Sequence, residues 1–138
     1  MKLDERLAQD SQFVAELPLC QLRLMNDARF PWLLLIPRRA EASEIFDLNK
    51  ADQQQLWHEA SVLGQMLKTL TQADKINVAS LGNVVGQLHV HVVARQRDDA
   101  AWPGPIWGHG ECQLYAPDRL DDMRHSLLAE LEKLQPPL

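Results

Sequence analysis

The sequence predicts an α+β domain in which a mainly antiparallel sheet packs with two principal helices. Segments of strand length, rich in aliphatic residues and bounded by Gly, Pro or Asn, indicate the sheet. Two longer segments, one central and one near the C-terminus, have the periodicity of amphipathic helices. A chain of 138 residues suits one compact domain over 1–138. We expect its core in about 18–97, followed by a C-terminal loop and helix in 98–138.

The N-terminal part predicts a short helix and then a β-hairpin. Residues 3–17 mix apolar and charged side chains, and Asp10-Ser11 can cap a helix that Pro18 ends. Leu19–Met25 alternate roughly with a period of two, which is typical of a strand. Trp32–Ile36 form a continuous apolar run of strand length, bounded by prolines. The turn residues between these strands favour a hairpin.

The central helix is predicted for about Lys50–Thr71. Asn49 is a suitable N-cap, and Asp52 places a negative charge beside the positive end of the helix dipole. Apolar residues then recur at helical spacing on one face: Leu56, Ala60, Leu63, Leu67 and Leu70. His58 lies beside this stripe, where we expect a structural role.

The second half predicts two neighbouring strands and a final helix. Lys75–Leu81 and Gln87–Arg95 have strand character, and Gly82-Asn83 marks a turn between them. The next loop carries two tryptophans, whose large apolar rings need a surface to pack on, so we expect a shaped loop. Pro117-Asp118 opens the last helix, which an apolar stripe continues.

Composition and charge exclude several classes of partner. Acidic residues outnumber basic ones by 19 to 14, and the net charge of -5 argues against binding to nucleic acid polymers or anionic membranes. The apolar runs are too short to cross a bilayer and the first residues lack a secretory signal, so we expect a cytoplasmic protein. Cys20 and Cys112 have no C-x-x-C spacing and are expected to be reduced thiols.

The segment QLHVHVVAR, residues 87–95, alternates polar and aliphatic side chains over its first half. Successive side chains of a strand point to opposite faces, so Gln87, His89 and His91 are expected on one face. The aliphatic residues between them occupy the other face. Half of this strand therefore suits burial, and half suits chemistry.

Three interpretations of the two histidines are open on this pattern. They can be ordinary residues of a half-exposed strand. His89 and His91 can also converge on a metal ion, although the residues that follow them offer no carboxylate. The third interpretation is nucleophilic catalysis, because an imidazole with a pKa of about 6.5 keeps a free lone pair at neutral pH. Gln87 and His91 would then hold the ring or the phosphate.

The segment QLHVHVV resembles the histidine triad motif, His-φ-His-φ-His-φ-φ with φ apolar, and Gln87 takes the place of the first histidine. The similarity extends over roughly residues 18–97. Further segments resemble family sequences: Asn26-Asp27 ahead of Pro31, the strand end LLLIPR at 33–38, Ile76-Asn77 for the family's Gly-x-Asn, and Gly82-Asn83 for its Gly-Gln pair.

This resemblance implies an antiparallel sheet with two main helices, usually in a homodimer whose sheets join. It also implies nucleotidyl hydrolase or transferase chemistry, without a cofactor or metal, on a small-molecule nucleotide. The substrate would be a nucleoside phosphoramidate, an adenylylated compound or a dinucleoside polyphosphate, attacked at its α-phosphate. His89 would be the nucleophile that forms a nucleotidyl-histidine, which water then hydrolyses. His91 would donate hydrogen bonds to phosphate oxygens or to the leaving group.

Two residues depart from the family pattern. Gln87 cannot become cationic, but its amide can form hydrogen bonds, so we expect it to orient rather than to transfer protons. Trp32 stands where many members carry an additional histidine, and we expect its one donor and its stacking face to contact the base or ribose of the substrate. The alignment with the family also assigns substrate contacts to Asn26, Asn77 and Asn83.

The loss of an ionisable group at Gln87 leaves two other functions open. One is a nucleotide-binding regulatory module that retains the pocket and turns over little substrate. The other is a metal-dependent enzyme that uses His89 and His91 as ligands.

Overall fold

The computed structural model describes all of residues 1–138 and contains one five-stranded sheet with the strand order β1-β2-β3-β5-β4. Every pair of neighbouring strands is antiparallel. The predicted α+β class is therefore confirmed. The elements in chain order are α1 (Glu5–Asp10), β1 (Ser11–Glu16), β2 (Cys20–Met25), β3 (Trp32–Pro37), the 3-10 turn η1 (Ile45–Asp47), α2 (Lys50–Thr71), β4 (Lys75–Ser80), β5 (Val90–Arg95) and α3 (Pro117–Glu132).

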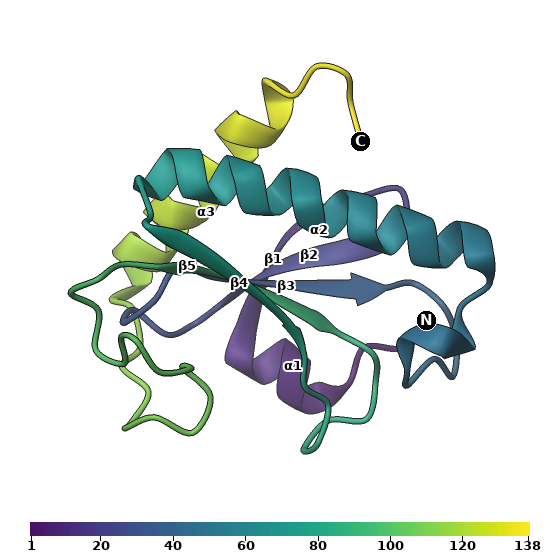
Figure 1. Cartoon of the computed structure of the whole chain (residues 1–138), viewed down its shortest axis with the longest axis horizontal. Helices are drawn as coiled ribbons and strands as arrows, with labels where there is room; N and C mark the ends of the chain where they lie inside the picture. The colour runs from purple at the N-terminus through teal and green to yellow at the C-terminus, as the bar shows by residue number, and fades with distance from the viewer.

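Helix α2 lies across one face of the sheet (Figure 1) and has the bounds that the sequence predicts. The side chain of Asn49 accepts a hydrogen bond from the backbone N–H of Asp52, which satisfies a free donor of the first turn. The C-cap residue Gln72 has a φ of 54°, in the left-handed region that closes many helices. Four residues of the predicted stripe are buried: Leu56, Ala60, Leu63 and Leu67.

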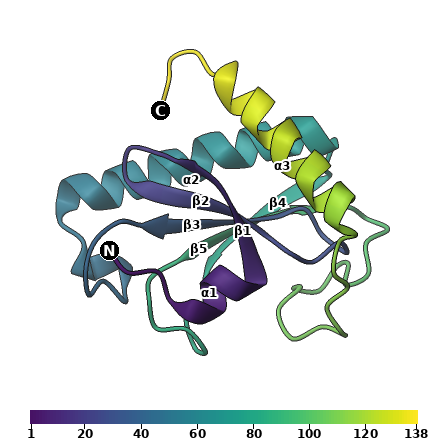
Figure 2. The ribbon, with the colours of Figure 1, turned by 180° about the vertical axis from the view of Figure 1, so that it is seen from behind.

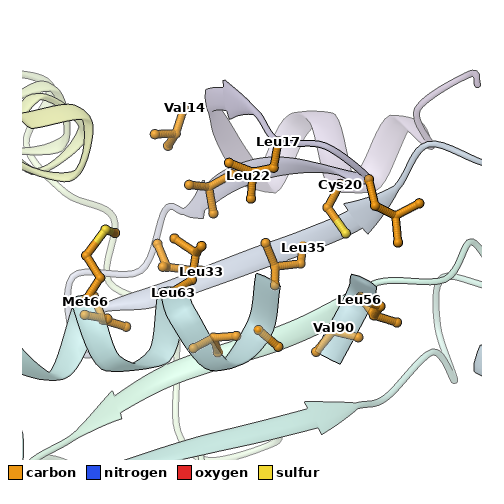
Figure 3. Packing of buried hydrophobic residues seen from close by; sticks show 14 of the residues in the cluster. Val14, Leu17, Cys20, Leu22, Leu33, Leu35, Leu56, Leu63, Met66 and Val90 are labelled. Atoms are coloured by element: carbon orange, nitrogen blue, oxygen red, sulfur yellow. The ribbon is translucent and has the colours of Figure 1, made fainter. Parts of the chain in front are cut away.

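The main core fills the space between α2 and the sheet. Figure 3 shows Leu22 and Leu35 of the sheet in one cluster with Leu56 and Leu63 of the helix. This cluster contains 21 buried residues, whereas the opposite face of the sheet carries two clusters of 4. Because burying a leucine side chain contributes about 1.5–3 kcal/mol, most apolar stabilisation comes from the α2 face. The thinner opposite face leaves room for a cavity.

Strand β5 directs the histidine segment to that opposite face. Val90 and Val92 belong to the core under α2, so His91 and Arg95 point away from the helix. All residues of β5 are nevertheless buried, because the second face is covered too. Figure 2 shows α1 and the long loop between β5 and α3 on this side of the sheet.

The sequence prediction for the N-terminal segment is wrong. Helix α1 is capped by Asp4 and ends at Asp10, and Ser11 begins strand β1 where a capped helix was expected. Residues 11–16 pair with β2, with a register irregularity between Phe13 and Ala15. Pairing with β2 satisfies the backbone groups of this segment, and this long-range contact overrides its local helical signals.

The remaining elements follow the prediction with small changes. Strands β2 and β3 form the expected hairpin, with Leu22 opposite Leu35. Helix α3 begins at Pro117 as predicted, and Leu127 is its one fully buried residue. No helix has both the length and the apolar character that crossing a membrane requires.

Candidate active site

A cavity of about 700 Å³ lies against the histidine face of the sheet. Its walls come from α1, the turn after β2, the loop between β4 and β5, and the loop that precedes α3. Five residues assigned from the sequence line it: Asn26, Trp32, Asn83, His89 and His91. The fold therefore brings together residues from four separate parts of the chain.

His89 lies just before β5 and is held by the backbone. Its Nδ1 is 2.7 Å from the carbonyl oxygen of Gln87. Because a carbonyl can only accept, Nδ1 must carry the proton and donate it to this oxygen. The lone pair of the ring is then on Nε2, and no residue of the chain forms a hydrogen bond there. A neutral imidazole in this tautomer is prepared for nucleophilic attack.

His91 has the opposite tautomer. The indole N–H of Trp32 donates to Nδ1 of His91 over 3.0 Å. An indole nitrogen can only donate, so Nδ1 of His91 is the acceptor and Nε2 carries the proton. The ring centroids of His89 and His91 are 4.9 Å apart in an edge-to-face arrangement. The site therefore combines a free lone pair on one ring with an N–H donor on the next.

Burial keeps His91 neutral. Desolvation lowers the pKa of His91 to about 4, and the neighbouring His89 acts in the same direction. The backbone carbonyl of Leu81 acts in the opposite direction, but no atom of the chain meets Nε2 with hydrogen-bond geometry. His91 is therefore a neutral donor over the physiological pH range.

Trp107, which the sequence assigned only to a packed loop, packs against both His91 and Trp32. Its ring centroid is 5.3 Å from that of His91 and 6.4 Å from that of Trp32. Two buried side-chain donors have no hydrogen-bond partner, and they are Nε2 of His91 and Nε1 of Trp107. Buried donors without acceptors cost about 1–3 kcal/mol each. An anionic ligand that supplies acceptor oxygens here would recover part of that cost.

The position of Gln87 contradicts the expectation that it shares a strand face with the histidines. Strand β5 begins only at Val90, and the side chain of Gln87 lies against the N-terminal segment. Its Oε1 accepts from the backbone N–H of Asp4 over 2.8 Å, and its Nε2 donates to the carbonyl of Lys2 over 3.2 Å. The residue orients His89 through its backbone oxygen, and its amide holds the segment that leads into α1.

Asn77 also lies outside the cavity. Its Oδ1 accepts a hydrogen bond of 2.8 Å from Arg95, which is 2% exposed. Arg95 pairs with Asp99 over 2.8 Å and donates to the carbonyl of Gly104. Burial acts to raise the pKa of Asp99, but hydrogen bonds from Arg95 and from backbone N–H groups outweigh it and hold the pKa at about 2. This cluster anchors the loop that carries Trp107.

The other two asparagines are at the cavity. The side-chain oxygen of Asn26 accepts from the backbone N–H of Tyr115 over 2.9 Å, which ties the segment before α3 to the turn after β2. Asn83 is an exposed cavity residue in the loop between β4 and β5. Both are therefore placed to meet a bound molecule.

Sequence reasoning missed the charged wall of the cavity. Arg29 donates two hydrogen bonds to Asp27 and one of 2.6 Å to the carbonyl of His109. Burial acts to raise the pKa of Asp27, but the bonds from Arg29 hold it below its usual value. Gly110 lies beside this pair with a φ of 59°, and a Cβ there would be 3.2 Å from Nη1 of Arg29. The turn-rich composition of the loop around Gly110 was visible in the sequence, but it does not reveal that this loop contacts Arg29.

The geometry does not resemble a metal centre. No group of three or more His, Cys, Asp or Glu side chains is arranged to hold an ion. The lone pair of His91 at Nδ1 is also already taken by the indole N–H of Trp32, so this ring has no free nitrogen for an ion.

Comparison with known proteins identifies the class of protein. Residues 6–98 match the family described as the HIT domain, which is more than half of the chain. The chain therefore belongs to this family, and the resemblance seen in the histidine segment is confirmed. No match was found among curated proteins.

Three solved bacterial structures are similar over nearly the whole chain. A histidine triad protein from Sinorhizobium meliloti 1021 is 45% identical with a TM-score of 0.92, over 94% of this chain and 96% of that chain. A histidine triad protein from Bradyrhizobium japonicum is 42% identical with a TM-score of 0.91, over 94% and 96%. One from Marinobacter aquaeolei VT8 is 41% identical with a TM-score of 0.92, over 96% and 97%.

Proposed function

We propose that this chain is a nucleotidyl hydrolase or transferase that acts at the α-phosphate of a small-molecule nucleotide. Membership of the HIT domain family supports a nucleotide-binding, hydrolase-type function. The proposed substrates are a nucleoside phosphoramidate, an adenylylated compound or a dinucleoside polyphosphate. His89 is the proposed nucleophile, and His91 and Trp107 are proposed hydrogen-bond donors to phosphate oxygens.

The observation that carries this proposal is the contact between Nδ1 of His89 and the carbonyl of Gln87. Attack on phosphorus requires an unprotonated nitrogen, and this contact places the lone pair on Nε2. When the N–P bond forms, the ring becomes cationic, and the same carbonyl then stabilises the charge. A single backbone oxygen therefore supports both the attack and the intermediate.

The two chemical steps balance without a metal or cofactor. In the first step the Nε2 lone pair forms a bond to phosphorus, and the bond from phosphorus to the leaving group breaks with its electron pair on that group. In the second step water attacks phosphorus, the N–P bond breaks, and its electron pair returns to Nε2. The proton of the attacking water passes to solvent. An acceptor alcohol or phosphate in place of water would make the reaction a transfer.

A nucleophilic role can be tested by chemical rescue. His89→Gly should lower kcat/KM by roughly 10⁴-fold, and free imidazole should restore part of it, because the small ring can occupy the vacated space. His58→Ala removes an exposed imidazole from α2 and serves as the control. Intact-protein mass spectrometry after quenching at neutral pH should detect an acid-labile nucleotidyl adduct at residue 89.

The same experiment separates the alternatives. Nucleotide binding without an adduct would favour the regulatory module with little turnover. Absence of both binding and adduct would reject the proposed function altogether. The homodimer expected from the family stays a prediction, which sedimentation velocity can test.

A further inference from the structure

Groups that can act as a general acid are scarce around the proposed nucleophile. Trp32 donates to Nδ1 of His91 over 3.0 Å, so a cationic His91 would place two N–H groups against each other. His91 is 4% exposed, so bulk water has little access to this contact. The cation can therefore form only if the bond to Trp32 breaks. The N–H that remains on neutral His91 can donate a hydrogen bond but is a very weak acid.

The other buried polar groups around the cavity do not supply the missing acid. The amide of Gln87 does not ionise and faces Lys2 and Asp4. Asp27 is held as a carboxylate by Arg29 through two hydrogen bonds. The remaining titratable residues of the wall are exposed: Arg6, Asp10, His109 and Cys112. Of these, His109 carries an imidazole, the commonest general acid of enzymes, and is therefore tested directly by substitution.

The absence of an acid matters differently for different leaving groups. An amine that leaves phosphorus must take up a proton, because an amide anion is too basic to depart. A phosphate, carboxylate or activated phenolate oxygen departs as a stable anion and needs no proton. General acid catalysis typically raises the rate by about 10²–10⁴-fold. A site without a general acid therefore strongly favours leaving groups that depart as stable anions.

We propose that this chain selects nucleotide anhydrides and activated esters, whose leaving group departs as a stable oxyanion, and that the hydrogen bond from Trp32 to His91 adds to the burial of His91 in setting this selectivity. The inference rests on the proposed function and narrows its substrate class. In the selected reaction the N–P bond forms at Nε2 of His89 and the P–O bond breaks. The leaving oxygen keeps the electron pair and receives no proton from the protein.

The wild-type protein alone provides the first test. We would compare kcat/KM for the p-nitrophenyl ester of adenosine 5′-monophosphate, the phenyl ester and adenosine 5′-phosphoramidate. The nitrophenyl ester should react at least about 100-fold faster than the other two substrates. Comparable rates for the nitrophenyl ester and the phosphoramidate would overturn the inference. This comparison does not depend on the folding of any variant.

Substituted proteins then test whether the selectivity between leaving groups depends on Trp32. Trp32→Phe frees Nδ1 of His91 for protonation, so the rate ratio between nitrophenyl ester and phosphoramidate should shrink by about tenfold. Trp102→Phe is the matched control, because its indole stacks on Arg95, 5.6 Å away, outside the cavity. An unchanged ratio in Trp32→Phe, or a changed ratio in His109→Ala, would overturn the role of Trp32. If no substrate forms an adduct at His89, the proposed function fails; if all form it equally, only this inference fails.

Discussion

The indole N–H of Trp32 donates a hydrogen bond to Nδ1 of His91, and the two side chains come from the adjacent strands β3 and β5. This bond determines which nitrogen of His91 carries the proton. Together with the bond from His89 to the backbone of Gln87, it assigns opposite tautomers to two neighbouring imidazoles. The pair therefore offers a free imidazole lone pair and an N–H donor at the same pH.

We expect the stability of the protein to depend on pH through His91. Its pKa is about 4 in the folded chain because the ring is buried, below the 6.5 of a free histidine. The unfolded chain therefore takes up the proton first, and the stability present above pH 6.5 is lost as the pH falls to about 4. Urea unfolding should show a loss of roughly 3 kcal/mol for this residue. His91→Asn should give a flatter profile, and parallel profiles would contradict the prediction.

Gln87→Ala should release the N-terminal segment. The variant loses both contacts of the amide, to Asp4 and to Lys2, and the unfolding free energy should fall by about 1–2 kcal/mol. Hydrogen exchange should become faster at the backbone N–H of Asp4. Gln54→Ala on the exposed face of α2 is the control. Unchanged exchange at Asp4 would show that the amide does not hold this segment.

Asp99→Ala should destabilise the protein and weaken substrate binding. It leaves the buried guanidinium of Arg95 without its charged partner, a change that typically costs about 3–5 kcal/mol. The loop with Ile106 and Trp107 would lose its anchor, so KM should rise. Asp98→Ala removes a neighbouring but exposed carboxylate and should leave stability within about 0.5 kcal/mol. Thermal unfolding and steady-state kinetics of both variants test this prediction, and equal melting temperatures would refute it.

Chelation should leave the activity unchanged. The structure shows no third ligand beside the two histidines, and the indole N–H of Trp32 already takes the lone pair of His91. We would measure turnover before and after dialysis against EDTA, and again after addition of Zn²⁺ or Mn²⁺. A loss of activity that either metal reverses would instead support the metal-dependent alternative.

The sequence predicts those parts of the fold that depend on local signals. The cap at Asn49 and the apolar stripe fix both ends of α2, and the prolines around β3 mark a strand. Segment 11–16 was assigned wrongly, because only its pairing with β2 makes it a strand.

The site was predictable in part, for the same reason. Alternation correctly placed His89 and His91 together, but the pattern continues into Gln87, where the strand has not yet begun. Asn77 resembled a ligand residue until the fold brought Arg95 beside it. Trp107 could not be assigned, because it reaches the site through a long irregular loop rather than a repeating element.

The partner that aligns His89 is a main-chain oxygen, and every amino acid brings one. A different side chain at position 87 would therefore still present the oxygen that aligns the ring of His89. The side chain at position 87 instead holds the N-terminal segment, so a single residue connects the alignment of His89 to the beginning of the chain.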